Sequence, residues 1–185
     1  MKAIPTAIPD VLVIEPAVFG DARGFFFESW NRRAFGELLG RDVAFVQDNH
    51  SASAQGVLRG LHYQVRQPQG KLVRVVAGEV FDVAVDLRRA SGTFGKWVAE
   101  RLSAENHRMM WVPPGFAHGF CTLLPDTVIS YKVTAHYAAE HDKGLAWDDP
   151  EVAVDWPAVA DAETLSAKDR VQPGLGEVRG AFDDR

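Results

Sequence analysis

Three polar side chains lie on strand-like stretches at positions that predict an inward orientation. They are His62 in "GVLRGLHYQ" (56–64), His118 in "GFAHGFCTL" (115–123) and Tyr131 in "TVISYKVT" (127–134). Alternate residues of a strand share one face, and the residues that share it here are Leu58 and Gly60, Phe116 and Phe120, and Ile129 and Val133, respectively. Histidine is the natural general base near neutral pH, and tyrosine can return a proton. Together they predict an interior pocket for acid–base chemistry, although each alone could be a buried polar group with a backbone partner.

Two cations stand close to His62 in the sequence. Lys71 follows the loop "RQPQG" (66–70), and Arg59 precedes His62 by three residues. A cation beside a ketone stabilises the oxyanion that forms when a neighbouring proton is removed. Lys71 taken alone would be a solvated lysine at a strand end in most proteins.

Gly60 lies between Arg59 and His62, which a regular strand would point to opposite faces. A β-bulge at Gly60 would turn both side chains toward the pocket. The alternative is a glycine that is kept small for close packing.

The histidines do not form a metal-binding pattern. The stretch His62-Tyr63-Gln64 lacks the second histidine of a His-x-His pair, and His62 with His118 supplies too few ligands. His50 and His107 lie in loop-like contexts and are predicted to be solvated. We therefore expect neither a metal nor another cofactor, and we expect Cys121 to be a small core residue.

Short alternating segments separated by turn residues must position these side chains. The clearest is "EVFDVAVDL" (79–87), where the apolar residues share one face and Asp82 and Asp86 share the other. Turns are predicted at 77–79, between two strands, and at Pro125-Asp126, within a hairpin. Residues 97–103 and 109–112 predict further strands, the second ending at Pro113. Roughly ten strands in all predict a compact antiparallel β-barrel or jelly roll.

Helical patterns are few. Residues 31–40 predict one helix that ends at Gly40, and residues 161–169 predict a second short helix. The stretch "GDARGFFFESW" (20–30) carries Arg23 and Glu28 on either side of three phenylalanines. It could stack a base and hold a phosphate, or it could pack in a core or a dimer interface.

Composition limits the class of protein. A chain of 185 residues fits one domain, and its net charge of -5 argues against nucleic-acid binding. The single cysteine excludes an intrachain disulfide and fits a reducing compartment. The first residues do not resemble a signal peptide, and no run of about 18 apolar residues predicts a membrane span. A cytoplasmic protein without membrane contact is expected.

Several long segments, assembled in order, resemble the dTDP-4-dehydrorhamnose 3,5-epimerase family, nucleotide-sugar epimerases of the cupin superfamily. The resemblance covers about residues 10–170 and includes "DARGFFFESW", "FVQDNHSAS", "GVLRGLHYQ", "QGKLVRVVAGEVFDVAVDLR", "WVPPGFAHGF" and "SAKD". It implies an all-β, cupin-type antiparallel jelly roll with a few short peripheral helices, homodimeric and without metal. The domain would span 1–185, with a peripheral tail from about 171, in which "GEVRGAFDDR" (176–185) is predicted to be poorly ordered.

The resemblance also implies a reaction and roles for residues. The substrate would be dTDP-4-dehydro-6-deoxy-D-glucose, inverted at C3 and C5. His62 would be the base, Asp169 the carboxylate that pairs with it and Tyr131 the proton donor, with Lys71 and Arg59 around the ketone and phosphates. Further substrate contacts would come from Arg23, Glu28, Gln47, Asp48, Asn49, His118, Asp142 and Lys168. Arg23 and Glu28 would reach nucleotide bound mainly by the partner subunit.

Two positions depart from the family pattern. Asp142 stands where a longer glutamate contacts the ligand, and His136 stands where an acidic residue is common. Asp169 taken alone could instead be a helix-capping or surface acid. Two other functions remain open: an epimerase that acts at C3 or C5 only, and a sugar-sensing cupin without catalysis, which would need neither base nor acid.

Overall fold

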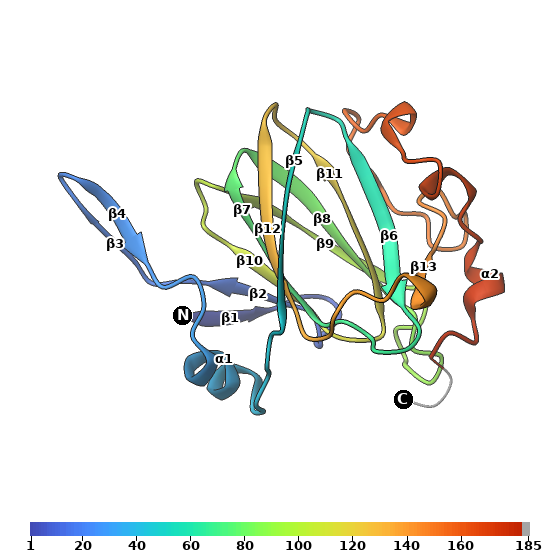
Figure 1. The fold of residues 1–185 in the computed structure, drawn as a ribbon, viewed down its shortest axis with the longest axis horizontal. Helices are drawn as coiled ribbons and strands as arrows, with labels where there is room; N and C mark the ends of the chain where they lie inside the picture. The colour runs from blue at the N-terminus through green and yellow to red at the C-terminus, as the bar shows by residue number, and fades with distance from the viewer. Residues whose placement is uncertain (183–185) are drawn as a thin grey trace.

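Two antiparallel sheets pack face to face in this computed structural model, which describes residues 1–182 (Figure 1). One sheet has the order β1 (Lys2–Pro5), β2 (Leu12–Glu15), β10 (Met109–Val112), β7 (Lys71–Ala77), β12 (Thr127–Val133) and β5 (Gln47–Ser53). The other has the order β13 (Asp142–Gly144), β6 (Leu58–Gln64), β11 (Phe116–Thr122), β8 (Glu79–Asp86) and β9 (Trp97–Ser103). The predicted all-β antiparallel jelly roll is confirmed.

Two of the connections that cross from one sheet to the other contain the predicted turns. The chain turns at Gly78, where φ is 77°, as predicted, but β7 and β8 lie in opposite sheets. The hairpin predicted across Pro125-Asp126 is wrong, because β11 pairs with β6 and β8 while β12 pairs with β5 and β7. By crossing, β11 and β12 bring Phe120 and Ile129 into one core from opposite sides.

Strand β8 is buried on both faces. The predicted alternation is present: Val80 and Ala84 belong to the core between the sheets, whereas Val83 and Val85 belong to a second core on the outer face. The polar face that carries Asp82 is therefore directed toward the barrel interior rather than solvent.

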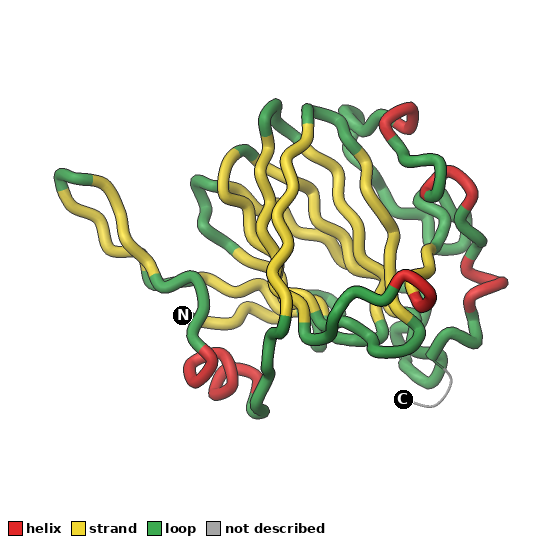
Figure 2. Tube along the Cα trace, viewed as in Figure 1, coloured by secondary structure: helices red, strands yellow, loops and turns green. Residues whose placement is uncertain are grey.

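The C-terminal segment covers the outer apolar face of β8. Helix α2 (Leu175–Val178) is short, yet Leu175, Val178 and Phe182 are all buried. The prediction of a poorly ordered tail is therefore wrong up to residue 182, because this tail shields apolar surface; residues 183–185 lie outside the described residues. The helix predicted at 161–169 is instead two 3-10 turns, η2 (Ala162–Thr164) and η3 (Asp169–Val171), within the long loops of Figure 2.

Two other short elements lie at the periphery of the barrel. The predicted first helix is confirmed as α1 (Arg32–Leu39), which ends at Gly40 with φ 66° and buries Phe35 against Trp111. A third 3-10 turn, η1 (Ala139–His141), immediately precedes β13. No helix within residues 1–182 is long and apolar enough to cross a membrane.

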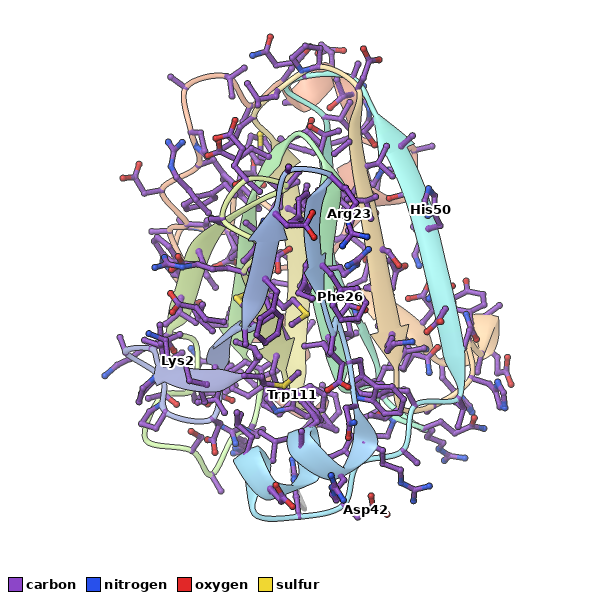
Figure 3. All side chains as sticks on the ribbon, turned by 90° about the vertical axis from the view of Figure 1, so that its left-hand side faces the viewer. Lys2, Arg23, Phe26, Asp42, His50 and Trp111 are labelled. Carbon is purple, nitrogen blue, oxygen red and sulfur yellow. The ribbon has the colours of Figure 1, made fainter. Side chains whose placement is uncertain are left out.

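A two-stranded hairpin, β3 (Val18–Asp21) and β4 (Gly24–Phe27), extends away from the barrel (Figure 1). It faces the viewer in Figure 3, where Arg23 and Phe26 are labelled. Phe19, Phe25 and Phe26 are 63–71% exposed, so these rings pack in no core of this chain. The Phe25 ring also touches His107, with centroids 4.6 Å apart. The prediction that His107 is fully solvated is wrong, whereas His50 is exposed as predicted, although on β5 rather than in a loop.

Candidate active site

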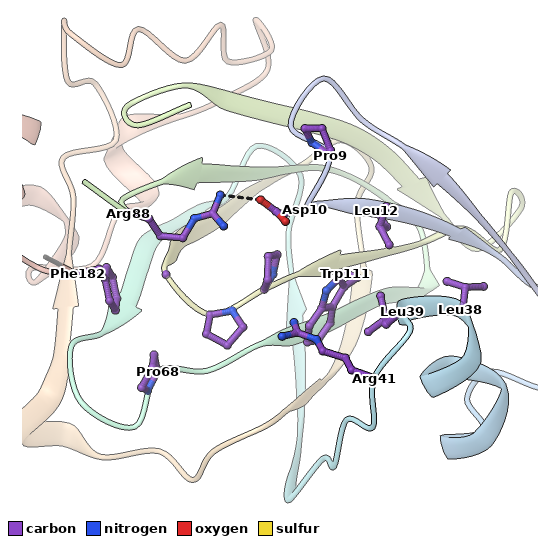
Figure 4. Close-up of a pocket in the computed structure, with 13 residues that line it drawn as sticks. Pro9, Asp10, Leu12, Leu38, Leu39, Arg41, Pro68, Arg88, Trp111 and Phe182 are labelled. Carbon is purple, nitrogen blue, oxygen red and sulfur yellow. Dashed lines mark ion pairs between the residues drawn. The ribbon is translucent and has the colours of Figure 1, made fainter. Parts of the chain in front are cut away.

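A cavity of about 430 Å³ opens between the two sheets. Its lining comprises Ser51, Val57, Leu58, Arg59, His62, Lys71, His118, Gly119, Phe120, Tyr131, Thr164, Ser166 and Asp169. The predicted base, its carboxylate, the proton donor and three further predicted polar residues thus meet in one place. A cavity of similar volume, about 440 Å³, lies beside Trp111 and the Arg88–Asp10 ion pair (Figure 4), but neither histidine nor tyrosine lines it.

His62 is hydrogen-bonded to Asp169. The His62 Nε2 lies 2.5 Å from Oδ1 of Asp169, which is buried at the start of η3. Burial opposes the charge on this carboxylate, yet the hydrogen bond and charge of His62 hold the pKa of Asp169 below its ordinary value. Asp169 is therefore neither a cap nor a surface acid, and the hydroxyl of Ser166 accepts its backbone N–H.

The predicted bulge is present at Gly60. His62 pairs with His118 and Arg59 pairs with Phe120, so Gly60 and Leu61 together oppose the single residue Gly119. The peptide between Gly60 and Leu61 is cis, and φ of Gly60 is 116°. A Cβ atom on Gly60 would lie 2.6 Å from the Gly119 Cα, so close approach and backbone conformation both require glycine. The extra residue explains how Arg59 and His62, three apart, both line the cavity.

Lys71 is a buried cation beside the base. Its Nζ lies 3.4 Å from the His62 carbonyl oxygen, to which it donates. Burial lowers the pKa of Lys71 to about 8, while the charges of Asp82 and Asp142 oppose this decrease. Lys71 thus remains largely an ammonium at neutral pH, in a place where an oxyanion could form.

Tyr131 and His118 complete the polar lining. Tyr131 projects from β12 and His62 from β6, so the candidate acid and base belong to opposite sheets. Burial raises the pKa of Tyr131, which keeps its phenol protonated. The His118 Nε2 lies 2.9 Å from Asp82 Oδ1, and burial lowers the pKa of this imidazole despite the charge of Asp82.

The remaining predicted contacts lie outside this lining. Gln47 and Asn49 hydrogen-bond to each other on β5, and Gln47 also accepts the backbone N–H of Tyr137. Asp48 lies on the other face of that strand and pairs with Lys132 at 3.0 Å.

Asp142 on β13 acts on the cavity residues through its charge. It contacts both Lys168 and the Tyr137 hydroxyl, and its charge influences Lys71 and Tyr131. Arg23 pairs with Asp21 on the extended hairpin.

Glu28 follows that hairpin and accepts a hydrogen bond from Asn31. Neither Arg23 nor Glu28 lines the cavity of its own chain.

Some site residues were not found from the sequence. Ser51, Thr164 and Ser166 line the cavity, but isolated hydroxyl residues give no pattern. Asp82 stands directly behind the lining, and the acidic face of an otherwise apolar strand was the available signal. Cys121 is a buried core residue as predicted, with its pKa raised to about 11 by burial. Within residues 1–182, no three His, Cys, Asp or Glu side chains gather as metal ligands would.

A sequence model of the dTDP-4-dehydrorhamnose 3,5-epimerase family matches residues 5–177. The chain belongs to this family. A family member from Pseudomonas aeruginosa is 65% identical over 170 residues, which cover 92% of this chain and 93% of the relative. One from Salmonella typhimurium is 54% identical over 178 residues, covering 96% and 97%.

Solved structures agree in fold. The Legionella pneumophila epimerase in complex with dTDP-4-keto-L-rhamnose has a TM-score of 0.93 and 48% identity, and the match covers 100% of this chain and 97% of that one. A 3'-monoepimerase from Streptomyces bikiniensis in complex with dTDP-quinovose has a TM-score of 0.88 and 30% identity, covering 95% and 88%. The cupin fold thus occurs in both double and single epimerases of nucleotide sugars.

Proposed function

We propose that the chain inverts C3 and C5 of dTDP-4-dehydro-6-deoxy-D-glucose to give dTDP-4-dehydro-L-rhamnose. The observation that carries this proposal is the pairing of His62 with Asp169 in a cavity that Tyr131 enters from the opposite sheet. Relatives named dTDP-4-dehydrorhamnose 3,5-epimerase, at up to 65% identity, support the choice of substrate. No metal or other cofactor is required for this chemistry.

The reaction follows from the position of the ketone. C3 and C5 both neighbour C4, so removal of either proton leaves an enolate with its charge on the C4 oxygen. His62 takes the proton, and Asp169 fixes its tautomer and stabilises the imidazolium that forms. Lys71 stabilises the enolate oxygen, and Tyr131 delivers a proton to the other face of the same carbon, which inverts it. Solvent then restores the protonation states of both side chains.

The other predicted contacts hold the nucleotide in this proposal. Arg59, His118, Asp142 and Lys168 surround the sugar and phosphates, while Gln47 and Asn49 line the approach along one face of β5. Asp48, on the opposite face, would contact substrate only through its neighbour Lys132. Arg23 and Glu28 would serve the partner's cavity in a homodimer, since they lie on or beside a hairpin that extends away from their own barrel. A cytoplasmic location stays a prediction from the sequence.

Deuterium incorporation in heavy water tests the reaction. We expect label at both C3 and C5 with the unmodified chain, and loss of exchange with His62→Ala. Tyr131→Phe should still incorporate deuterium at a carbon that His62 deprotonates, but that carbon should no longer be inverted. Label at one carbon only would instead indicate a single-position epimerase. Binding of the keto sugar without any exchange would indicate a sugar sensor and overturn the proposal.

A further inference from the structure

Asp82 is a buried carboxylate that the reaction above does not use. It lies on the inward face of β8 with 0% exposure and does not line the cavity. Its Oδ1 is 2.9 Å from His118 Nε2, whereas its Oδ2 has no hydrogen-bond partner among residues 1–182. A buried charged oxygen without a partner is costly, so a purely structural role would be served better by an apolar residue.

Two residues in front of Asp82 do line the cavity. His118 and Lys71 are only 6% and 8% exposed, and the charge of Asp82 acts on both. Nothing else within the described chain hydrogen-bonds the His118 ring, so Asp82 makes the one polar contact that orients it there. A neutral His118 that donates Nε2–H to Asp82 leaves Nδ1 as an acceptor for a substrate hydroxyl.

We propose that Asp82 is a positioning residue for this site, which holds His118 by its ring nitrogen and supplies the buried negative charge that keeps Lys71 an ammonium beside the substrate ketone. The proposal rests on the proposed function. It adds to that function a second carboxylate, Asp82, which acts on the cation Lys71 rather than on the base His62. Asp169 would thus act through His62, and Asp82 through Lys71 and His118.

Several charged or titratable groups besides Asp82 face Lys71 from the surrounding elements. They are Arg59 and His62 on β6, His118 on β11, Tyr131 on β12, Asp142 on β13 and Asp169 on η3. Asp142 also favours the ammonium, but it is partly exposed and is engaged by Lys168. Asp82 is fully buried, so water screens its effect on Lys71 least.

The test compares Asp82→Asn, which keeps the shape but removes the charge, with Glu79→Gln, which removes a charge at the half-buried start of the same strand. Nitrogen-15 NMR of labelled lysine follows the Lys71 Nζ from about pH 6 to 10, assigned with Lys71→Arg. We expect Asp82→Asn to lower the Lys71 midpoint and Glu79→Gln to leave it unchanged. A decrease of about one pH unit, from a midpoint near 8, would reduce the ammonium fraction about fivefold at pH 8 but only by about a tenth at pH 6. The ratio of kcat between variant and unmodified enzyme should fall in the same way.

An unchanged Lys71 midpoint in folded Asp82→Asn would overturn the proposal, even in an active enzyme. A kcat ratio that is the same at pH 6 and pH 8 would also overturn it, since a merely structural loss does not depend on pH. If the unmodified chain exchanges no substrate proton while the Lys71 midpoint still falls, the proposed function fails and the link between Asp82 and Lys71 stands. Should Asp82→Asn not fold, carbon-13 NMR of the unmodified protein decides, because an Asp82 carboxyl that is un-ionised near neutral pH contradicts the proposal.

Discussion

The imidazole of His62 receives its carboxylate from Asp169, 107 residues further along the chain. Because Nε2 is held by Asp169, the ring has a fixed tautomer and its other nitrogen is free to act as the base. A carboxylate in this position stabilises the imidazolium only after proton removal, so it acts on the rate more than on substrate binding.

Asp169→Asn tests this at the residue scale. We expect kcat to fall by roughly 10²–10⁴-fold with little change in KM, because the amide can hold the ring in the wrong tautomer and carries no charge. Steady-state kinetics and solvent exchange measure the effect. Arg170→Gln, which changes a neighbouring exposed residue, serves as the control. An increase in KM with kcat unchanged would instead assign Asp169 to substrate binding.

Lys71 predicts the alkaline limit of activity. Its ammonium is the active form and its pKa is lowered to about 8, so kcat should decline as the pH rises through this value. Stability moves in the opposite direction: between about 8 and the ordinary value of about 10.4 the unfolded chain binds more protons at this residue, so its contribution to the free energy of unfolding rises with pH. Rate profiles and denaturant unfolding check the two signs. Lys71→Arg should lose the alkaline decline, because guanidinium stays charged.

Residue types on strand faces predicted which side chains meet in the cavity. They did not predict the carboxylates that pair with these side chains. His62, His118 and Tyr131 each interrupt an apolar face, so alternation alone placed them inside. The partner of His62 could not be obtained this way, since Asp169 lies in an irregular segment and only the family resemblance indicated it. Asp82 was visible on its face of β8, yet nothing local shows which face of a doubly buried strand points into the barrel.

At the scale of elements, the bulge at Gly60 allows Arg59 and His62 of β6 to line one cavity. The Gly60 backbone also helps to hold the pKa of Asp169 below its ordinary value, so the bulge affects both the base and its carboxylate. The strands themselves followed from period-two patterns, but their partners did not. Strands that are consecutive in sequence are expected to pair as hairpins. In this barrel, however, the chain crosses to the opposite sheet after β7 and after β11.

Gly60→Ala tests the bulge. Its Cβ would lie 2.6 Å from the Gly119 Cα and 2.8 Å from the His118 carbonyl oxygen, in a backbone conformation that alanine rarely adopts. We expect a loss of about 2–4 kcal/mol in the free energy of unfolding, together with reduced kcat. Gly92→Ala is the matched control, because nothing lies within 4 Å of its added methyl group. Equal stability of the two variants would mean that the bulge relaxes without strain.

For the whole molecule, the hairpin β3–β4 is the largest departure from a closed barrel. Its phenylalanines expose apolar surface of the kind that proteins cover with a partner. The sequence alone left a nucleotide contact and an interface equally open. In the described fold the rings lie away from their own cavity, which favours the homodimer proposed above.

Phe26→Asp tests that dimer. We expect sedimentation to report a monomer, and KM for the nucleotide sugar to rise about tenfold or more as Arg23 and Glu28 leave the partner's cavity. Exchange chemistry at His62 should persist at saturating substrate. Leu124→Asp, another exposed apolar residue at a turn, should leave the mass and KM unchanged. A Phe26→Asp variant that remains dimeric would remove the hairpin from the interface.

The position of Asp169 after the last strand of the barrel also affects when the active site forms during synthesis of the chain. Translation delivers the chain from its N-terminus, so all the barrel strands leave the ribosome before the segment that carries this carboxylate. The barrel strands can therefore emerge while His62 still lacks its partner and the cavity lacks the wall that Thr164, Ser166 and Asp169 form. Enzymatic competence then begins with the docking of the last segment, and a polypeptide that ends before Asp169 has no carboxylate to pair with His62.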